Sequence, residues 1–406
     1  MSHRLATLTA LAWSSCLFFS CGKSESEEEP AAAAPVGPPA AVMAEIAAWR
    51  GVGGTTDLRD LATKPAAPGT RNAADLHNPL IEIMQGMSMP DRELIGDPWE
   101  SPVTSLKYVL ETYETELATI KEALALPYCN WGTDFEDGQQ ALMPHLSYTR
   151  TMARLLACEA RVRADAGDFD AAAESILNVL SLSEQVAAES VSLAMLISGS
   201  IDALAIEVIE RFFEKSERLP PALIAALKKR QPRSQLRKAY LGEGTMMISA
   251  FVELAGGAPT TPVAQQSMSE PVAEGLVWTL QTIRLFVEQS DRPLWQKTDE
   301  AEARPKPTSA MLPEMPFGMS FDAGTFARLS HTSASFENNL SLAITALQLR
   351  EHKARHGEYP DPRSFKTPED VFTGRPIEYV RGTSGFTLVA ERAGLTGQRD
   401  QHVWEW

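Results

Sequence analysis

Apolar residues recur at three- and four-residue steps along most of the chain, which is the spacing of amphipathic helices. The spacing predicts helices in these stretches: 42–50, 104–125, 146–166, 169–188, 192–214, 234–254, 276–288 and 323–355. Gly167 and Asp168 separate two of them, as a helix end and a good N-cap. No strand pattern precedes residue 370. The chain is therefore predicted to be mainly α-helical.

The turn between the stretches at 146–166 and 169–188 resembles that of a tetratricopeptide (TPR) helical hairpin, on the residues from 161 to 172. Only one such unit is visible, and stacked repeats need about three to bury their faces. We therefore expect an irregular helical bundle with one TPR-like hairpin in a domain at 42–290. A Pro- and Met-bearing linker at 291–322 would follow it.

Near the end of the chain the apolar spacing changes from helical to the alternation typical of strands. Two short alternating runs at 376–381 and 385–390 are joined by a Gly-Thr-Ser turn, which predicts a β-hairpin. Residues 402–406 could add a third strand. Together with the long helix before it, this hairpin predicts a small α+β unit at 323–406.

This unit carries a characteristic set of residues after its helix: Gly357, Tyr359, Pro360, Phe372, Gly374, Pro376, Tyr379 and Phe386. On these residues it resembles the soluble part of type II secretion pseudopilins, where a helix leads through a Gly-x-Tyr-Pro turn into an antiparallel sheet. Gly357 would end the helix in a left-handed conformation, and the aromatic rings would cover the helix. Such pseudopilins bind calcium in a late acidic loop. Here 394–401 offers only Asp400, so we expect no calcium site.

The N-terminus has the pattern of an export signal. Its apolar run at 5–19 is too short to span about 30 Å of hydrocarbon but suits a signal peptide. Ser20 and Cys21 at its end resemble a bacterial lipobox, although Phe18 stands where Leu is usual. The resemblance implies a signal peptide at 1–20 and lipid, such as palmitate, on Cys21. The alternatives are an ordinary signal peptide cut elsewhere and an uncleaved anchor.

A tether rich in Glu, Ala and Pro follows at 21–41, and it cannot bury apolar surface. By the lipobox resemblance, Gly22 in place of Asp favours the outer membrane, with the body facing the periplasm or the cell surface. The mature chain is also similar to an uncharacterised family of bacterial exported proteins, which join a helical region to a pseudopilin-like tail. The helical match runs from about Cys129 to Phe213. This resemblance implies a fold and lends no activity.

The net negative charge of the protein argues against polyanionic partners. The formal net charge of the 406 residues is -16, whereas binding a polyanion requires concentrated Lys and Arg. We therefore expect no nucleic acid partner and no binding of anionic lipid through the folded body. The membrane contact would be the lipid anchor alone.

Two cysteines remain after the signal peptide and the lipid site are set aside, Cys129 and Cys158. In an oxidising compartment they could pair, and closing the loop between them would stabilise the fold by about 3–4 kcal/mol. The alternative is two separate buried thiols. Spacing alone does not choose between them.

Three clusters contain residue types that can bind a metal, dock a partner or catalyse a reaction. His352 and His356 have an i, i+4 spacing that can hold zinc, but the residues between them are cationic and no third ligand is evident. A polar helix end is the favoured interpretation, so we expect no metal and no cofactor. A basic run from Lys228 to Lys238 could dock an acidic partner, although a solvated helix end is favoured.

The third cluster joins three acidic residues of one loop, Asp134, Glu136 and Asp137, to His145. Carboxylates lining a buried pocket could act as general acid and base, which would make the protein an envelope hydrolase. A solvated turn is the commoner outcome. A third possibility is a small-ligand carrier with an apolar cavity in the region 190–290. The favoured hypothesis is a non-catalytic scaffold or protein- or peptide-binding module, held at the cell envelope by lipid.

Overall fold

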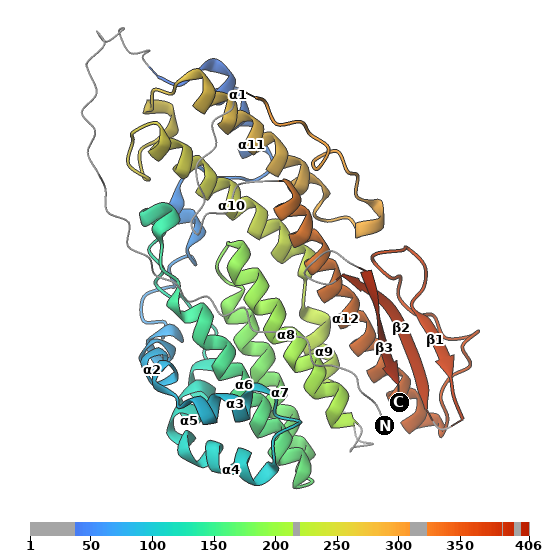
Figure 1. Cartoon of the computed structure of the whole chain (residues 1–406). Coiled ribbons are helices and arrows are strands. Elements are labelled where there is room, and N and C mark those ends of the chain that lie inside the picture. Colours follow the sequence, from blue (N-terminus) through green and yellow to red (C-terminus); the bar gives the residue numbers. More distant parts are fainter. Residues whose placement is uncertain (1–36, 214–219, 309–322, 384, 394–398, 406) are drawn as a thin grey trace. The chain divides into compact units, whose positions relative to one another are not determined.

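Helices make up most of the structure, which confirms the mainly α-helical prediction (Figure 1). The computed structural model describes residues 37–213, 220–308, 323–383, 385–393 and 399–405. Cys21 and nearly all of the tether lie outside these residues. The α-helices are α1 (Ala40–Gly51), α2 (Ala74–Gly86), α3 (Met89–Gly96), α4 (Val103–Thr112), α5 (Glu114–Leu124), α6 (Pro144–Asp165), α7 (Phe169–Val186), α8 (Ser192–Phe213), α9 (Pro221–Lys229), α10 (Pro232–Leu254), α11 (Glu270–Gln289) and α12 (Ala323–His356).

The chain ends in a small antiparallel sheet with the strand order β1-β2-β3. Its strands are β1 (Glu378–Arg381), β2 (Phe386–Ala393) and β3 (Arg399–Glu405). The register places Leu388 of β2 between Tyr379 of β1 and Trp404 of β3, and all three side chains are buried. The predicted hairpin and its third strand are thus confirmed. Four short 3-10 helices complete the described elements: η1 (Leu58–Leu61), η2 (Phe135–Gln140), η3 (Val263–Gln265) and η4 (Leu294–Gln296).

The N-terminal half departs from the predicted pattern in two places. The single helix expected at 104–125 is broken into α4 and α5 at Tyr113, whose backbone leaves the helical region. The break lets α4 pack on α3 and α6 while α5 packs on α2 and α7. In addition, α2 and α3 were not predicted, because Pro79 and Pro90 lie within their short spans and obscure the apolar spacing.

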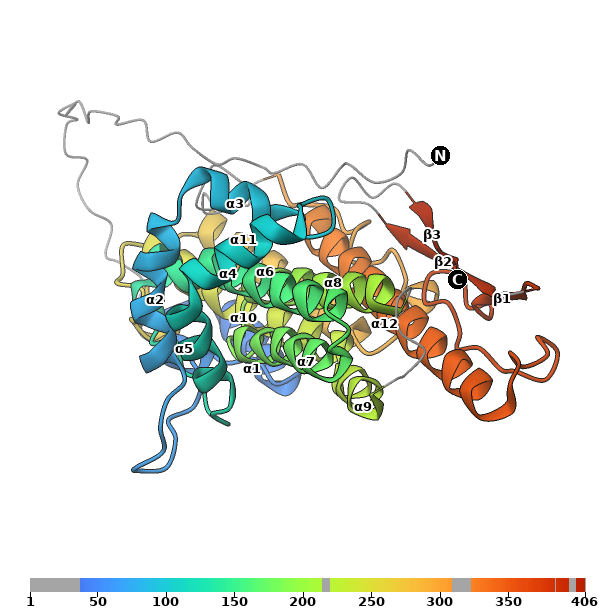
Figure 2. The ribbon, with the colours of Figure 1, turned by 90° about the horizontal axis from the view of Figure 1, so that it is seen from below.

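The predicted hairpin of α6 and α7 forms the centre of the helical body. Asp168 caps α7, with its side chain accepting a hydrogen bond from the backbone N–H of Ala171 at 3.2 Å. The two helices pack along each other, and α8 packs against both. On one side α2 to α5 contact α6, and on the other α8 contacts α10 and α12 (Figure 2). The hairpin is therefore one pair within a bundle.

Among the described helices, α8 is the one with the length and apolarity to cross a membrane. More than half of its apolar stretch is buried, at 56%. Ile201, Ala205 and Ile209 on this helix are fully enclosed. A core helix of a water-exposed body has the same apolar character.

The long helix α12 packs on two sides. One side contacts α8, α10 and α11, and the other contacts β2 of the sheet. The buried side chain of Asn338 donates to the backbone oxygen of Glu391 at 2.7 Å and accepts from the N–H of Val371 at 3.0 Å. These bonds attach the sheet and the loop before it to the middle of α12.

Glycine and aromatic residues shape the turn after α12 and its contact with the sheet. Gly357 ends α12 with φ near +80°, a conformation that residues with a Cβ rarely adopt. The Tyr379 hydroxyl donates to the backbone oxygen of Pro360 at 2.9 Å. Tyr359 meets Phe386 edge to face, with ring centroids 5.1 Å apart. The turn is therefore held by aromatic packing and one buried hydrogen bond.

The loop before β1 is held by a buried carboxylate. Asp370 accepts backbone hydrogen bonds from Phe372 at 2.8 Å and from Glu391 at 2.6 Å. Phe372 itself is buried, and Pro376 pairs with Glu369 in an isolated β-bridge. The segment 394–401, where we expect no calcium site, falls mostly on 394–398, which lie outside the described residues.

The described part of the expected linker, 291–308, is packed against the body. The Trp278 indole N–H donates to the backbone oxygen of Pro305 at 2.9 Å, and the N–H of Trp295 donates to the backbone oxygen of Val371 at 3.1 Å. The Trp295 ring also covers Gly374, leaving no room there for a Cβ. Val36–Trp406 form one compact unit. We call the segment 291–308 the strap.

A close backbone approach fixes α10 against the chain that enters α8. A Cβ added to Gly242 would lie 1.4 Å from the backbone oxygen of Ser190, a distance that requires the backbone to move. A second position of α10 is restricted in the same way, since a Cβ added to Gly244 would lie 2.3 Å from the Trp49 ring.

We predict that Gly242→Ala destabilises the protein by about 2 kcal/mol or more, because overpacking a filled site forces backbone shifts. The matched control is Gly86→Ala in α2, where no atom lies within 4 Å of the added Cβ. This control should leave stability unchanged or raise it slightly. Urea unfolding followed by circular dichroism measures both, and equal effects of the two variants would contradict the contact.

Candidate functional site

The acidic loop does not form the pocket that a hydrolase requires. Asp134, Glu136 and Asp137 are all exposed, whereas His145 is only 2% exposed and lies inside the bundle. The Asp134 side chain accepts from the N–H of Glu136 at 2.9 Å, as the cap of η2. The structure thus separates the three carboxylates from the histidine expected beside them.

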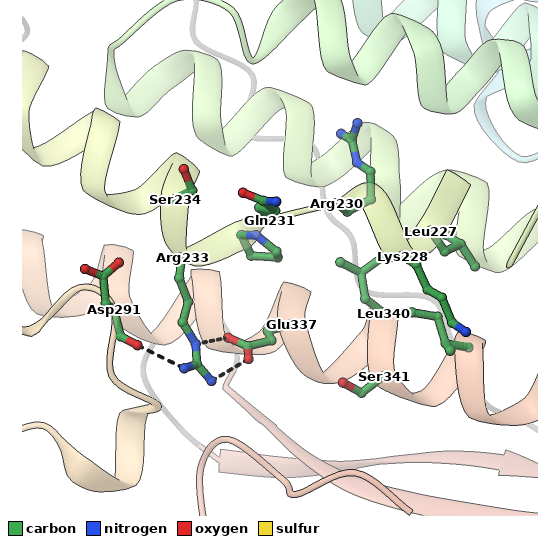
Figure 3. Close-up of a pocket in the computed structure, with 12 residues that line it drawn as sticks. Leu227, Lys228, Arg230, Gln231, Arg233, Ser234, Asp291, Glu337, Leu340 and Ser341 are labelled. Carbon is green, nitrogen blue, oxygen red and sulfur yellow. Dashed lines mark hydrogen bonds and ion pairs between the residues drawn. The ribbon is translucent and has the colours of Figure 1, made fainter. Parts of the chain in front are cut away.

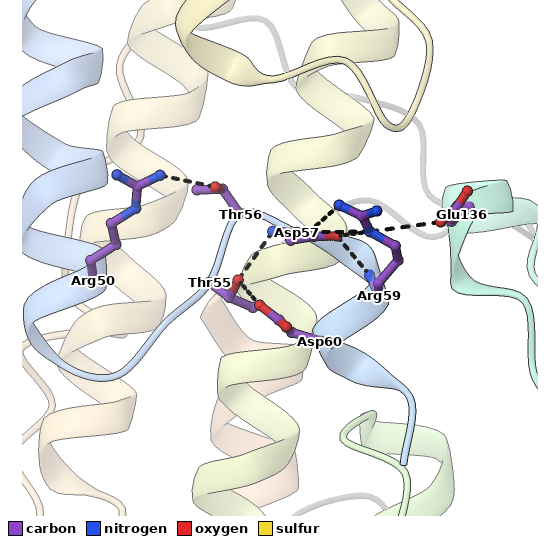
Figure 4. Close-up of polar contacts among 7 residues, drawn as sticks. All are labelled: Arg50, Thr55, Thr56, Asp57, Arg59, Asp60 and Glu136. Carbon is purple, nitrogen blue, oxygen red and sulfur yellow. Dashed lines mark hydrogen bonds and ion pairs between the residues drawn. The ribbon is translucent and has the colours of Figure 1, made fainter. Parts of the chain in front are cut away.

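Figure 4 shows what the acidic loop contacts instead. The Glu136 carboxylate lies 3.7 Å from the Arg59 guanidinium, which pairs with Asp57 at 2.6 Å. The Arg59 hydrogen bond holds the pKa of Asp57 below its ordinary value. Nearby, Thr55 donates to Asp60 at 2.5 Å. These are exposed polar contacts that hold the segment after α1 against η2.

His145 belongs to a buried cluster that sequence spacing did not reveal. The Trp131 indole stacks on His145, with ring centroids 4.6 Å apart, and on His77, at 5.3 Å. The two histidines come from α6 and α2, far apart in the chain, so no local pattern could have paired them. We call these three residues the His–Trp–His cluster.

Polar partners from the end of α7 fix both imidazoles. Glu189 lies 3.1 Å from Nε2 of His145 and also accepts from the Thr133 hydroxyl. Gln185 contacts Nε2 of His77 at 2.9 Å. The side-chain nitrogen of Gln185 donates to a backbone oxygen of α5, so its oxygen must accept from His77. Nε2 of His77 therefore carries the proton.

The other ring nitrogen of His77, Nδ1, is buried without a hydrogen-bond partner in the described structure. A proton there would place a positive charge in a dry interior. Burial accordingly lowers the pKa of His77, and its hydrogen bond to Gln185 opposes this only partly. The cluster thus joins α2, α6 and the end of α7, and all three of its rings are buried in the helical body.

The two cysteines are free thiols in the structure, and both are buried. Burial raises the pKa of each thiol to about 12. At neutral pH they are therefore protonated and behave as small apolar side chains.

The basic run splits into an inward and an outward part. Arg230, at the junction of α9 and α10, turns inward and is 8% exposed. Its guanidinium bonds the buried carboxylate of Asp202 at 2.8 and 3.0 Å and lies 3.3 Å from Glu184. Burial raises the pKa of Asp202 even though the Arg230 charge lowers it. This pair fixes the junction, while Lys228 and Lys229 stay exposed.

A groove of about 460 Å³ opens beside this junction, between α9, α10 and α12 (Figure 3). Its apolar lining consists of Pro232 and Ile344, which are half-buried, above Leu227 and Leu340, which are almost fully buried. Arg233 at one end donates to the Glu337 carboxylate at 2.8 and 2.6 Å and to the backbone oxygen of Asp291 at 3.0 Å. We call it the α9–α12 groove.

Several polar groups of the α9–α12 groove remain available. Within the part of the chain that the structure describes, the side chains of Lys228, Gln231 and Ser234 make no hydrogen bond or ion pair. They border the apolar lining of the groove. This combination can hold apolar side chains of a ligand while its polar groups meet the rim.

His352 and His356 lie together at the end of α12, with ring centroids 4.3 Å apart. His352 lines a second groove of about 440 Å³ with Arg355, Phe365 and Lys366. Among the described residues, no three His, Cys, Asp or Glu side chains are grouped as metal ligands. The structure therefore adds no ligand to the histidine pair.

Comparisons with protein-family models, curated proteins and solved structures gave no match. Of the predicted site residues, the acidic loop and His145 are separated, and the basic run contributes one face of the α9–α12 groove.

The His–Trp–His cluster predicts acid sensitivity. In the unfolded chain the pKa of His77 is near 6.5, and in the folded state it is lower. Below about pH 6.5 the unfolded state therefore binds more protons than the folded state. Stability should fall as the pH drops below about 6.5, by up to about 1.4 kcal/mol per unit from this group. Urea unfolding at pH 7, 6 and 5 measures the slope.

His77→Gln should remove this part of the slope whatever it does to stability at pH 7. The control His356→Gln changes an exposed histidine and should leave the slope as in the unchanged protein. The same slope in all three proteins would show that His77 does not titrate on unfolding.

Proposed function

We propose that the protein is a lipid-anchored cell-envelope protein whose folded body is a non-catalytic module that binds a protein or peptide. The observation that carries the binding role is the α9–α12 groove, with its apolar surface and unpaired polar rim. A volume of about 460 Å³ suits a few side chains of a peptide. The groove would hold such side chains on its apolar surface and their backbone at Gln231 and Ser234.

Fixed walls support this role, because a preformed groove loses little freedom on binding. Arg230 is held by Asp202 on the α9 side, and Arg233 is held by Glu337 on the α12 side. Leu227 and Leu340 beneath them are 1% and 5% exposed. The groove therefore keeps its shape without a ligand.

The two alternatives have less support. A hydrolase would need the carboxylates of the 134–137 loop in a pocket, and they lie at the surface. A small-ligand carrier would need an apolar cavity within 190–290. The side chains of Phe251, Leu280 and Ile283 fill the core there, as parts of one cluster. The open α9–α12 groove favours a partner that binds from outside.

The proposed location at the cell envelope rests on the first thirty residues, which lie outside the described part of the chain. A lipobox-like Ser20-Cys21 ends the apolar run, and the acidic tether follows. Acylation of Cys21 would hold the body at the membrane while the tether lets it reach an envelope partner. With Gly22 after the cysteine, we favour the outer membrane.

We predict that the protein incorporates radiolabelled palmitate and that Cys21→Ala loses both the label and membrane association. Cys16→Ala, within the signal peptide, is the matched control and should keep both. Fractionation of labelled cells measures the two properties together. Absence of label from the unchanged protein would mean that Cys21 is not acylated.

For the α9–α12 groove, we predict that Lys228→Glu weakens partner binding about tenfold, the effect of losing one charge-assisted contact of about 1.4 kcal/mol. A photo-crosslinking amino acid at Ile344 would report binding in living cells as a discrete adduct. Lys229→Glu is the matched control, since Lys229 is exposed next to the groove without lining it.

The expected result is an adduct from Ile344 that Lys228→Glu reduces and Lys229→Glu leaves unchanged. The same reduction from both variants would assign the effect to general charge. An adduct that neither variant changes would contradict the role of Lys228, and absence of any adduct would contradict the groove as the binding site.

A further inference from the structure

Lys297 is a half-buried lysine of the strap that is held by a hydrogen bond and makes no ion pair with any described residue. It follows η4 in the strap, where its N–H bonds the backbone oxygen of Leu294 at 3.0 Å. Its side chain is half-buried against α12, so part of the residue remains exposed. Lys121, in contrast, pairs with Glu159, and Lys228 extends into solvent.

A directed chain of hydrogen bonds holds the Lys297 amine. Its Nζ donates to the Ser330 hydroxyl oxygen at 3.2 Å. The Tyr240 hydroxyl donates to the backbone oxygen of Phe326 at 2.7 Å, so at its 2.7 Å contact with Ser330 it must accept. Ser330 therefore donates to Tyr240 and accepts from Lys297. In its uncharged form the amine donates one N–H to Ser330, and the lone pair on its nitrogen makes no hydrogen bond within the described structure.

The charged groups around Lys297 leave it without a close anion. Within the described residues, no carboxylate lies at ion-pair distance from its Nζ. Burial is the main cause that lowers the pKa of Lys297, to about 8; the Arg233 charge adds to it, and Glu337 and Asp291 oppose it. Since Arg233 bonds Glu337 directly, that carboxylate is already engaged. With this pKa about a tenth of the amine is uncharged at pH 7, far more than of an ordinary lysine.

We propose that the Lys297 amine is a nucleophile that condenses with a small aldehyde or ketone. The lone pair of Nζ forms a bond to the carbonyl carbon while the C=O π electrons move to oxygen, which takes a proton released by the nitrogen. The resulting carbinolamine loses water, which contains the former carbonyl oxygen, and an imine remains. No oxidant or reductant is needed.

Ser330 serves as a positioning residue in this proposal. It is 4% exposed, and its hydroxyl proton is given to Tyr240, so it is neither accessible nor free to attack. Its oxygen instead fixes one N–H of Lys297. The inference is independent of what occupies the α9–α12 groove.

Site-resolved reductive methylation tests the proposal on the full chain. Dilute formaldehyde with cyanoborohydride traps imines as methylamines, and peptide mass spectrometry gives the rate at each lysine from pH 6.5 to 10. At pH 8 about half of Lys297 would be uncharged, against under about 1% of an ordinary lysine. We expect Lys297 to react at least about tenfold faster than Lys229 and Lys366. Equal or slower reaction at Lys297 would overturn the proposal.

Two variants should move the pH midpoint of Lys297 labelling in opposite directions. Arg233→Gln removes a nearby positive charge and should raise the midpoint, whereas Ser330→Ala removes the acceptor of the ammonium and should lower it. Arg292→Gln, which changes an exposed arginine of the strap, is the control and should change nothing. General loosening would expose the amine and raise the midpoint in both variants, so a rise in both would contradict the assigned roles.

Discussion

The packing of α12 on two sides is the constraint on which the rest of the structure depends. A helix that contacts α8 and α10 on one side and β2 on the other cannot move without disturbing both. Asn338 bonds the loop and strand of the sheet from the middle of this helix. From the same helix, Ser330 bonds Tyr240 of α10. The central strand of the sheet, β2, packs on this helix, so the buried face of the sheet relies on α12.

The same helix brings together the two proposed sites. Glu337 of α12 bonds Arg233, which borders the α9–α12 groove, and both charges act on Lys297 in the strap. A change in the position of α12 would therefore alter the groove wall and the charge around the amine together. Buried and half-buried ion pairs are weak evidence for stability, but they do fix the orientation of the elements they join.

Sequence reasoning predicted what depends on local periodicity. The long helices, the α6–α7 hairpin and the strands of the sheet all follow from apolar spacing and turn residues. It did not predict the direction of individual side chains. His145 lies close to the acidic loop in the chain but turns into the core, and Arg230 leaves an exposed basic run to meet Asp202. His77 and Trp131 meet through tertiary packing alone, which no spacing encodes.

The placement of charge argues for a body that binds without large rearrangement. Arg230 and Asp202 are buried together between α9 and α8. Separating them would leave each charge buried without a partner, which is strongly unfavourable. Arg284 and Glu45 likewise join α11 to α1 at 3.1 Å. Elements tied in this way favour one arrangement over others, so the α9–α12 groove would exist before its partner arrives. The loss of freedom on binding would then fall mainly on the partner, as expected when a flexible peptide meets a preformed surface.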